Sequence, residues 1–183
     1  MLEEAIQQFG KSKGLHPHIL ERWCNWAEED GAALLGMAQV LKPGENHLRD
    51  LMDWLEEIEI RDALSIRDVL QSQEGIVTNP RLGRADRLKR VKEQIRRMRY
   101  PRLAQLEDSI QSCIKELRLH PAIRVSVPPG LEGGDLRFEF TVMNSDELKE
   151  IVRKLSEVSE SEPLAQIFTL LKGGLDDSAQ AAN

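Results

Sequence analysis

The sequence predicts an α+β fold that is mostly helical. The first 72 residues and a basic stretch after them carry apolar side chains at helical spacing, whereas the apolar period changes to two after Pro121. We therefore expect an N-terminal helical bundle over 1–72, a linker and a long, kinked basic helix over 73–102, and a C-terminal α-β-β-α unit with a two-stranded antiparallel ribbon over 103–173. Residues 174–183 are expected to form a disordered tail.

The N-terminal segments have the pattern of a small bundle of about four helices. Gly31 is expected to break or bend the chain that follows the first of them. The helix over 46–62 places leucine and isoleucine on one face and Asp and Glu on the others. Trp23, Trp26 and Trp54 are expected to seal the bundle, with a groove for a protein partner as the alternative.

The stretch from Arg84 to Arg102 gathers positive charge in a chain whose formal net charge is -6. Its acids are Asp86 and Glu93. Because guanidinium forks suit phosphate oxygens, its basic side chains are the candidate nucleic-acid-binding residues. They are Arg84, Arg87, Lys89, Arg90, Lys92, Arg96, Arg97, Arg99 and Arg102. Pro101 interrupts the apolar seam and predicts a kink near Tyr100.

Two functions remain open for this helix. In the first, the protein is a non-catalytic, DNA-associated dimeric accessory protein that contacts phosphates through the basic helix. In the second, the basic helix pairs internally with the acidic helix 46–62 and no nucleic acid is bound. The protein is then a dimeric adaptor whose N-terminal bundle binds another protein.

The C-terminal pattern predicts a ribbon that needs a partner. Apolar residues alternate from Ile123 to Val127 and from Leu136 to Val142, and Asn144 with Glu147 forms a capping box before the next helix. A two-stranded ribbon is marginally stable alone, so we expect a homodimer. The expected dimerisation residues are Leu136, Phe138, Phe140, Leu148, Ile151, Val152 and Leu155.

Residues 103–155 resemble the C-terminal dimerisation domain of ParB, the bacterial chromosome- and plasmid-partitioning protein. The likeness rests on "LAQLEDSIQSCIKELRLHPAIRVSV" and "GGDLRFEFTVMNSDELKEIVRKL". It implies a dimer module, association with DNA and a bacterial source. The remaining sequence departs from the family, because it has neither a G-E-R-R-like motif nor a recognisable helix-turn-helix.

Other classes of protein are not indicated. The chain has no P-loop, no G-x-G-x-x-G and no G-x-S-x-G, so we expect no enzyme and no cofactor. Cys24 and Cys113 form no C-x-x-C pair and the histidines are scattered, so we expect no metal site. No apolar run is long enough to span a bilayer and the acidic N-terminus does not read as a signal peptide. We expect a cytoplasmic protein without a membrane partner.

Overall fold

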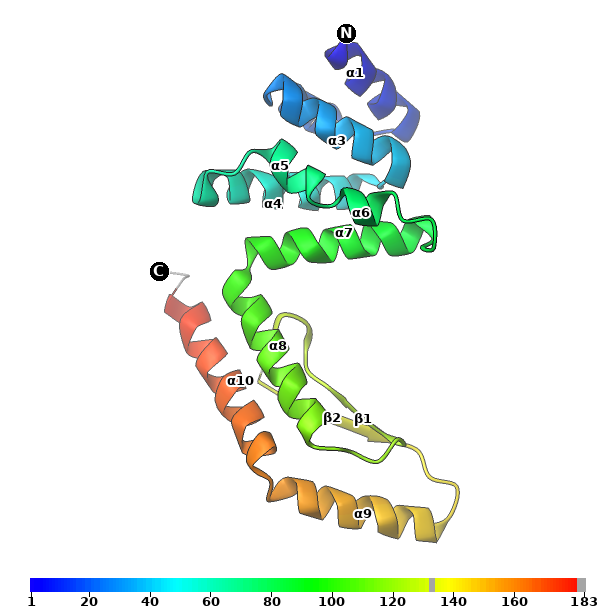
Figure 1. Ribbon diagram of the computed structural model, residues 1–183, viewed down its shortest axis with the longest axis vertical. Helices are drawn as coiled ribbons and strands as arrows, with labels where there is room; N and C mark the ends of the chain where they lie inside the picture. The colour runs from blue at the N-terminus through cyan, green and yellow to red at the C-terminus, as the bar shows by residue number, and fades with distance from the viewer. Residues whose placement is uncertain (132–133, 181–183) are drawn as a thin grey trace. The chain divides into compact units, whose positions relative to one another are not determined.

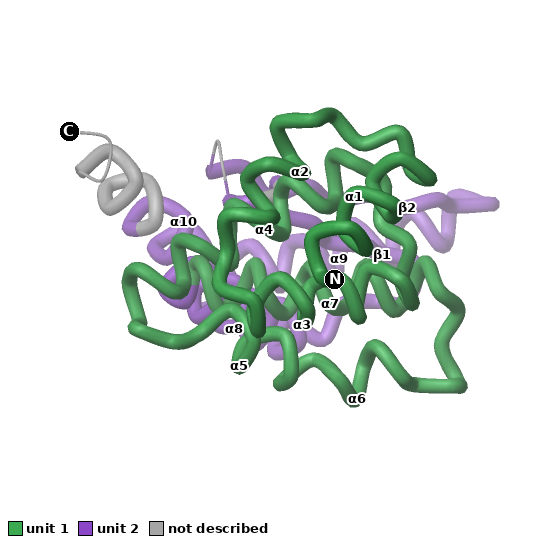
Figure 2. Tube along the Cα trace, turned by 90° about the horizontal axis from the view of Figure 1, so that it is seen from above, with its two compact units in different colours: residues 1–100 green, residues 101–183 purple. Residues whose placement is uncertain are grey.

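The computed structural model describes residues 1–131 and 134–180 and confirms the α+β, mostly helical fold (Figure 1). These residues form ten α-helices, one 3-10 turn and a two-stranded antiparallel sheet. The chain divides into two compact units, unit 1 over Met1–Tyr100 and unit 2 over Pro101–Asn183 (Figure 2).

Unit 1 is a bundle of seven helices. They are α1 (Leu2–Lys13), α2 (Pro17–Cys24), α3 (Glu28–Leu41), α4 (Glu45–Asp62), α5 (Ile66–Gln71), α6 (Glu74–Val77) and α7 (Arg84–Arg99). The prediction of about four helices before residue 73 omits α1. Within the bundle α4 lies alongside α7 (Figure 1), and α3 packs against α5.

Gly31 lies inside α3 and does not break the chain, which turns earlier, between α2 and α3. The backbone carbonyl of Gly31 accepts a hydrogen bond from Trp23 Nε1 at 3.1 Å. A Cβ at position 31 would lie 3.5–3.8 Å from side-chain atoms of Leu2, Ile6 and Trp23. The glycine therefore lies where α1 and α2 approach α3.

The basic helix α7 groups with unit 1, whereas the sequence predicted a boundary after residue 72. Val91 and Ile95 are fully buried in the same core cluster as Leu55 and other residues of α4. This packing makes α7 the last helix of the bundle instead of a linker. The expected interruption is present, because α7 ends before Tyr100 and the next helix starts at Pro101.

Unit 2 combines three helices with the ribbon. Its elements are α8 (Pro101–Glu116), β1 (Ile123–Ser126), the 3-10 turn η1 (Pro129–Leu131), β2 (Arg137–Phe140), α9 (Ser145–Ser159) and α10 (Glu162–Gln180). α10 packs along α8, where Ile110, Leu117, Ile167 and Leu171 are buried. α10 continues to Gln180, into the range expected to be a disordered tail, and residues 181–183 lie outside the described part of the chain.

The ribbon has the predicted antiparallel pairing, with Ile123 opposite Phe140 and Val125 opposite Phe138. Asn144 caps α9 as expected, because its side-chain oxygen accepts hydrogen bonds from the backbone N–H groups of residues 146 and 147. The second half of the capping box differs. The carboxylate of Glu147 accepts from the backbone N–H of residue 143 at 2.8 Å and from the Asn144 side-chain amide at 3.0 Å.

Candidate nucleic-acid interface

α7 is an amphipathic helix with its apolar stripe in the core of unit 1. It starts after Gly83, and Asp86 lies in its first turn. Its last turn carries three arginines, which complement the negative end of the helix dipole. Val91 and Ile95 face inward, with Leu88 partly buried beside them. A polyanion can therefore meet only the flanks and the outer side of this helix.

Lys92 is held on the side of α7 that faces α4. Its Nζ lies 2.8 Å from Asp50 Oδ2 and 3.0 Å from His47 Nδ1. The same ammonium lies 5.3 Å from the centroid of the Trp54 ring, within reach of a cation–π contact. The Lys92 side chain is 18% exposed. This lysine is thus engaged by the protein's own acidic helix.

Arg99 repeats this arrangement seven residues later. Its Nε forms an ion pair with Glu57, which itself lies seven residues after Asp50 on α4. Seven residues are about two helical turns, so Lys92 and Arg99 follow the spacing of Asp50 and Glu57 along parallel helices. We call the Asp50–Lys92 and Glu57–Arg99 pairs the charge ladder. The ladder places the acids of α4 against the basic helix.

Other basic side chains of the segment also have partners. Arg87 Nη1 donates to the carbonyl oxygen of Val77 at 2.7 Å. Arg96 donates two hydrogen bonds of 2.9 Å to Glu93, and these lower the pKa of the Glu93 carboxyl. Arg97 and Arg102 are likewise engaged by neighbouring groups. A phosphate would have to displace these contacts to reach the arginines.

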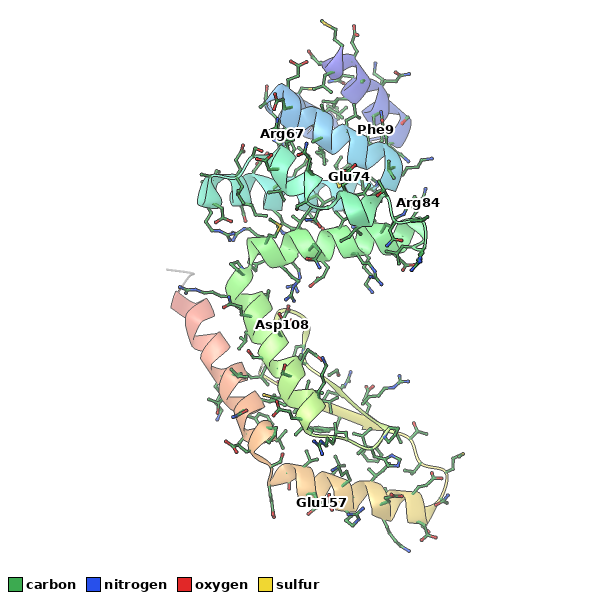
Figure 3. All side chains as sticks on the ribbon, in the orientation of Figure 1. Phe9, Arg67, Glu74, Arg84, Asp108 and Glu157 are labelled. Carbon is green, nitrogen blue, oxygen red and sulfur yellow. The ribbon has the colours of Figure 1, made fainter. Side chains whose placement is uncertain are left out.

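Arg84, Lys89 and Arg90 are exposed and form no recorded ion pair within residues 1–131 and 134–180. Arg84 is labelled at the start of α7 in Figure 3. Lys89 and Arg90 line a surface hollow of about 330 Å³ together with Asp86 and Glu93. Both acids of the basic stretch therefore lie beside its exposed cations, where they weaken the positive field.

A further arginine, Arg22 on α2, binds the other side of α4. Its Nη1 lies 2.6 Å from Asp53 Oδ1, and its Nη2 lies 2.6 Å from Glu56 Oε2. Trp26 Nε1 also donates to Glu56, at 2.8 Å. The sequence analysis missed Arg22, because no local pattern singles out an arginine whose partners come from a helix some 30 residues later.

Glu56→Gln is expected to reduce the loss of stability in acid. Burial raises the pKa of Glu56, but the hydrogen bonds from Arg22 and Trp26 outweigh it and hold the pKa below its ordinary value. A carboxyl whose pKa is lower in the folded than in the unfolded state contributes stability above the unfolded pKa, and this is lost as the pH falls. Melting temperatures measured between about pH 5 and 3 should fall less steeply for the variant. Identical slopes would contradict this role for Glu56.

All three tryptophans are part of the bundle, as expected. Trp23 is fully buried and meets Phe9 edge-on, with ring centroids 6.0 Å apart. Trp26 is hydrogen-bonded to Glu56, and Trp54 lies beneath Lys92. Their rings are therefore engaged within unit 1.

The expected dimerisation residues differ in their exposure. Ile151 is buried inside unit 2, so it is an internal residue instead of a surface contact. Leu136 packs against the core formed by α8 and α10. Phe138 and Leu155 are half-buried, whereas Phe140, Leu148 and Val152 are exposed.

No family model matches the chain, and no curated protein or solved structure matches it significantly. The resemblance of residues 103–155 to ParB therefore stays a prediction. Within the described ranges, no group of three or more His, Cys, Asp or Glu side chains is placed to hold a metal ion. No helix of that part of the chain has the length and apolarity needed to cross a membrane.

Proposed function

We propose that the protein is a non-catalytic homodimeric adaptor in which the basic helix is a structural element. The observation that carries this proposal is the charge ladder, Asp50–Lys92 and Glu57–Arg99. A phosphate that approached Lys92 or Arg99 would compete with a carboxylate of the same chain and would be repelled by it. The clustering of basic residues in the sequence is then explained by the acidic helix beside them.

Exposed apolar side chains support binding to other proteins. On unit 2, Leu148 and Val152 are exposed on one face of α9 and Phe140 is exposed on β2, which supports self-association. On unit 1, Ile60 and Leu64 are exposed four residues apart at the end of α4. We propose that two copies join through unit 2 and that each unit 1 binds a protein partner.

Fluorescence anisotropy with a labelled generic duplex, at salt from about 20 to 200 mM, tests the role of the basic helix. Light scattering on the same samples gives the mass of the protein. We expect a dimer with no binding to DNA even at the lowest salt. Tight binding with a steep negative salt dependence would overturn the structural role and favour DNA association.

DNA association remains a second candidate because Arg84, Lys89 and Arg90 are exposed without a recorded ion pair in the described residues. If these three contact phosphates, the slope of log affinity against log salt should be about -3. Arg84→Glu with Lys89→Glu and Arg90→Glu should then abolish binding without changing the unfolding of unit 1.

The matched control for that triple variant is Lys11→Glu with Lys13→Glu and Lys42→Glu. These lysines are exposed on unit 1 outside α7, and their reversal changes the net charge by the same amount. An equal loss of affinity in both triple variants would contradict a localised DNA contact and would indicate a response to net charge alone.

A further inference from the structure

One face of α9 is a shallow apolar groove of about 660 Å³ that runs along most of the helix. Leu148 and Val152 in this groove are 41% and 55% exposed. Ile151 and Val158 elsewhere on the same helix are buried. One side of α9 is therefore buried within unit 2. A second side carries apolar side chains that unit 2 leaves exposed.

Charges of opposite sign flank the two halves of this groove. Lys149 and Arg153 line its N-terminal half, whereas Glu157 and Glu160 line its C-terminal half; Glu157 is labelled on α9 in Figure 3. In an antiparallel pair of identical helices whose two-fold axis passes near Lys154, Lys149 of one copy lies opposite Glu160 of the other. Arg153 then lies opposite Glu157, and the symmetry produces each ion pair twice. Within one chain Arg153 Nη1 lies 2.5 Å from Glu157 Oε1 and Lys149 Nζ lies 2.9 Å from Asp146 Oδ1, so these side chains would exchange solvent-exposed partners of their own helix for partners across the axis.

The acids at the C-terminal end of α9 oppose its dipole, whereas Asp146 and Glu147 in its first turn complement it. Glu157 lies in the last turn, which holds no basic residue, and Glu160 follows it at the C-cap. Acids at this end are unfavourable because the helix C-terminus carries partial negative charge. Arg153 and Lys154 of the same helix already lie beside Glu157, and an antiparallel second copy would bring Lys149 and Arg153 of its own chain to this end as well, where Glu160 follows.

The floor of the groove allows close approach of such a copy. Val152 and the small Ser156 lie on either side of the proposed axis, so Val152 of each copy packs near Ser156 of the other. Leu148 lies further out, and Met143 just before the helix is 89% exposed. The apolar area that the two helices would bury is small. The four charged positions therefore contribute much of the specificity for an antiparallel second copy.

We propose that this face of α9 binds α9 of a second copy, antiparallel, with Lys149–Glu160 and Arg153–Glu157 as the ion pairs between chains. This inference rests on the proposed homodimer and names the surface through which it forms. The occupant is a second copy because the charge pattern is complementary to itself under a two-fold rotation.

Charge reversal in the full-length chain tests the pairing. Lys149→Glu with Arg153→Glu makes an acidic α9, and Glu157→Lys with Glu160→Lys makes a basic α9. Each variant alone should dimerise at least about 100-fold more weakly than the wild type, because like charges then meet across the axis. An equimolar mixture should form a heterodimer, detected by native mass spectrometry.

Two further variants control for folding and for net charge. All four reversals on one chain restore the complementarity and should restore the homodimer. Lys115→Glu with Arg124→Glu changes the net charge as much as the acidic variant does, at exposed positions of unit 2 outside α9, and should leave the dimer intact. Far-UV circular dichroism reports whether each variant keeps its helices.

The outcomes separate this inference from the proposed homodimer. A monomeric wild type would overturn both. A wild-type dimer that survives both double reversals, or a mixture that stays monomeric, would overturn the α9 pairing and leave the homodimer to another surface, such as the free edge of β2. Loss of the dimer in each double variant, with recovery in the mixture, would establish the antiparallel α9 pairing.

Discussion

Ile95→Ala is expected to destabilise unit 1 by about 2–4 kcal/mol. Ile95 is fully buried in the middle of α7, within the core that α7 shares with the other helices of the bundle. Truncation removes buried methyl groups and leaves a cavity that a packed helix cannot fully close. A basic helix that served only as a linker would tolerate this change at almost no cost.

Urea unfolding followed by tryptophan fluorescence measures this effect on unit 1 alone, because all three tryptophans lie before residue 55. Ile60→Ala is the matched control. It makes the same truncation on α4, where the isoleucine is 84% exposed, and should change the stability by no more than about 0.5 kcal/mol. Equal unfolding midpoints for both variants would show that α7 is not part of the core.

Lys92→Glu combined with Arg99→Glu is expected to cost unit 1 about 2–3 kcal/mol. The double change places like charges opposite Asp50 and Glu57 in both pairs of the charge ladder. Both acids are partly exposed, so solvent screening keeps the cost below that of breaking two fully buried pairs. The loss should shrink in about 1 M salt, where the Debye length is roughly 3 Å.

Restoring complementary charge tests whether the loss comes from the ladder itself. Adding Asp50→Lys and Glu57→Arg to the double variant should recover more than half of the lost stability, measured by the same tryptophan fluorescence. Lys11→Glu with Lys13→Glu alters the net charge equally on α1 and should have little effect. If the quadruple variant is no more stable than the double variant, electrostatic pairing does not explain the contact between α4 and α7.

Local patterns predicted much of the fold. Helical spacing identified the apolar side of α7, period-two alternation identified both strands, and the Asn144 cap located the start of α9. The conformation at Gly31 could not be judged in this way. Its apparent helix-breaking character is overridden by the close approach of Leu2, Ile6 and Trp23, which come from other helices.

The pairing of charges between α4 and α7 could not be predicted from the sequence of either helix alone. The sequence showed that an acidic and a basic helix exist, and left open whether they pair. Which charges meet follows from the parallel register of α4 and α7, and that register is set by buried apolar groups such as Val91. For the same reason, the division of the basic residues into paired and exposed could not be read from their spacing.

The end of α7 is fixed by a side chain from another helix. Arg61 on α4, itself hydrogen-bonded to Asp62, donates to the carbonyl oxygens of Met98 and Arg99 at 2.7 and 2.5 Å. A continuing helix would offer these two carbonyls to the N–H groups of residues 102 and 103. Arg61 therefore competes with elongation, while Pro101 withdraws one donor. The helix ends here because Arg61 already occupies the two carbonyl acceptors. A peptide that contained only the residues around Tyr100 would keep Pro101 but would lack Arg61, one of the two groups that end the helix.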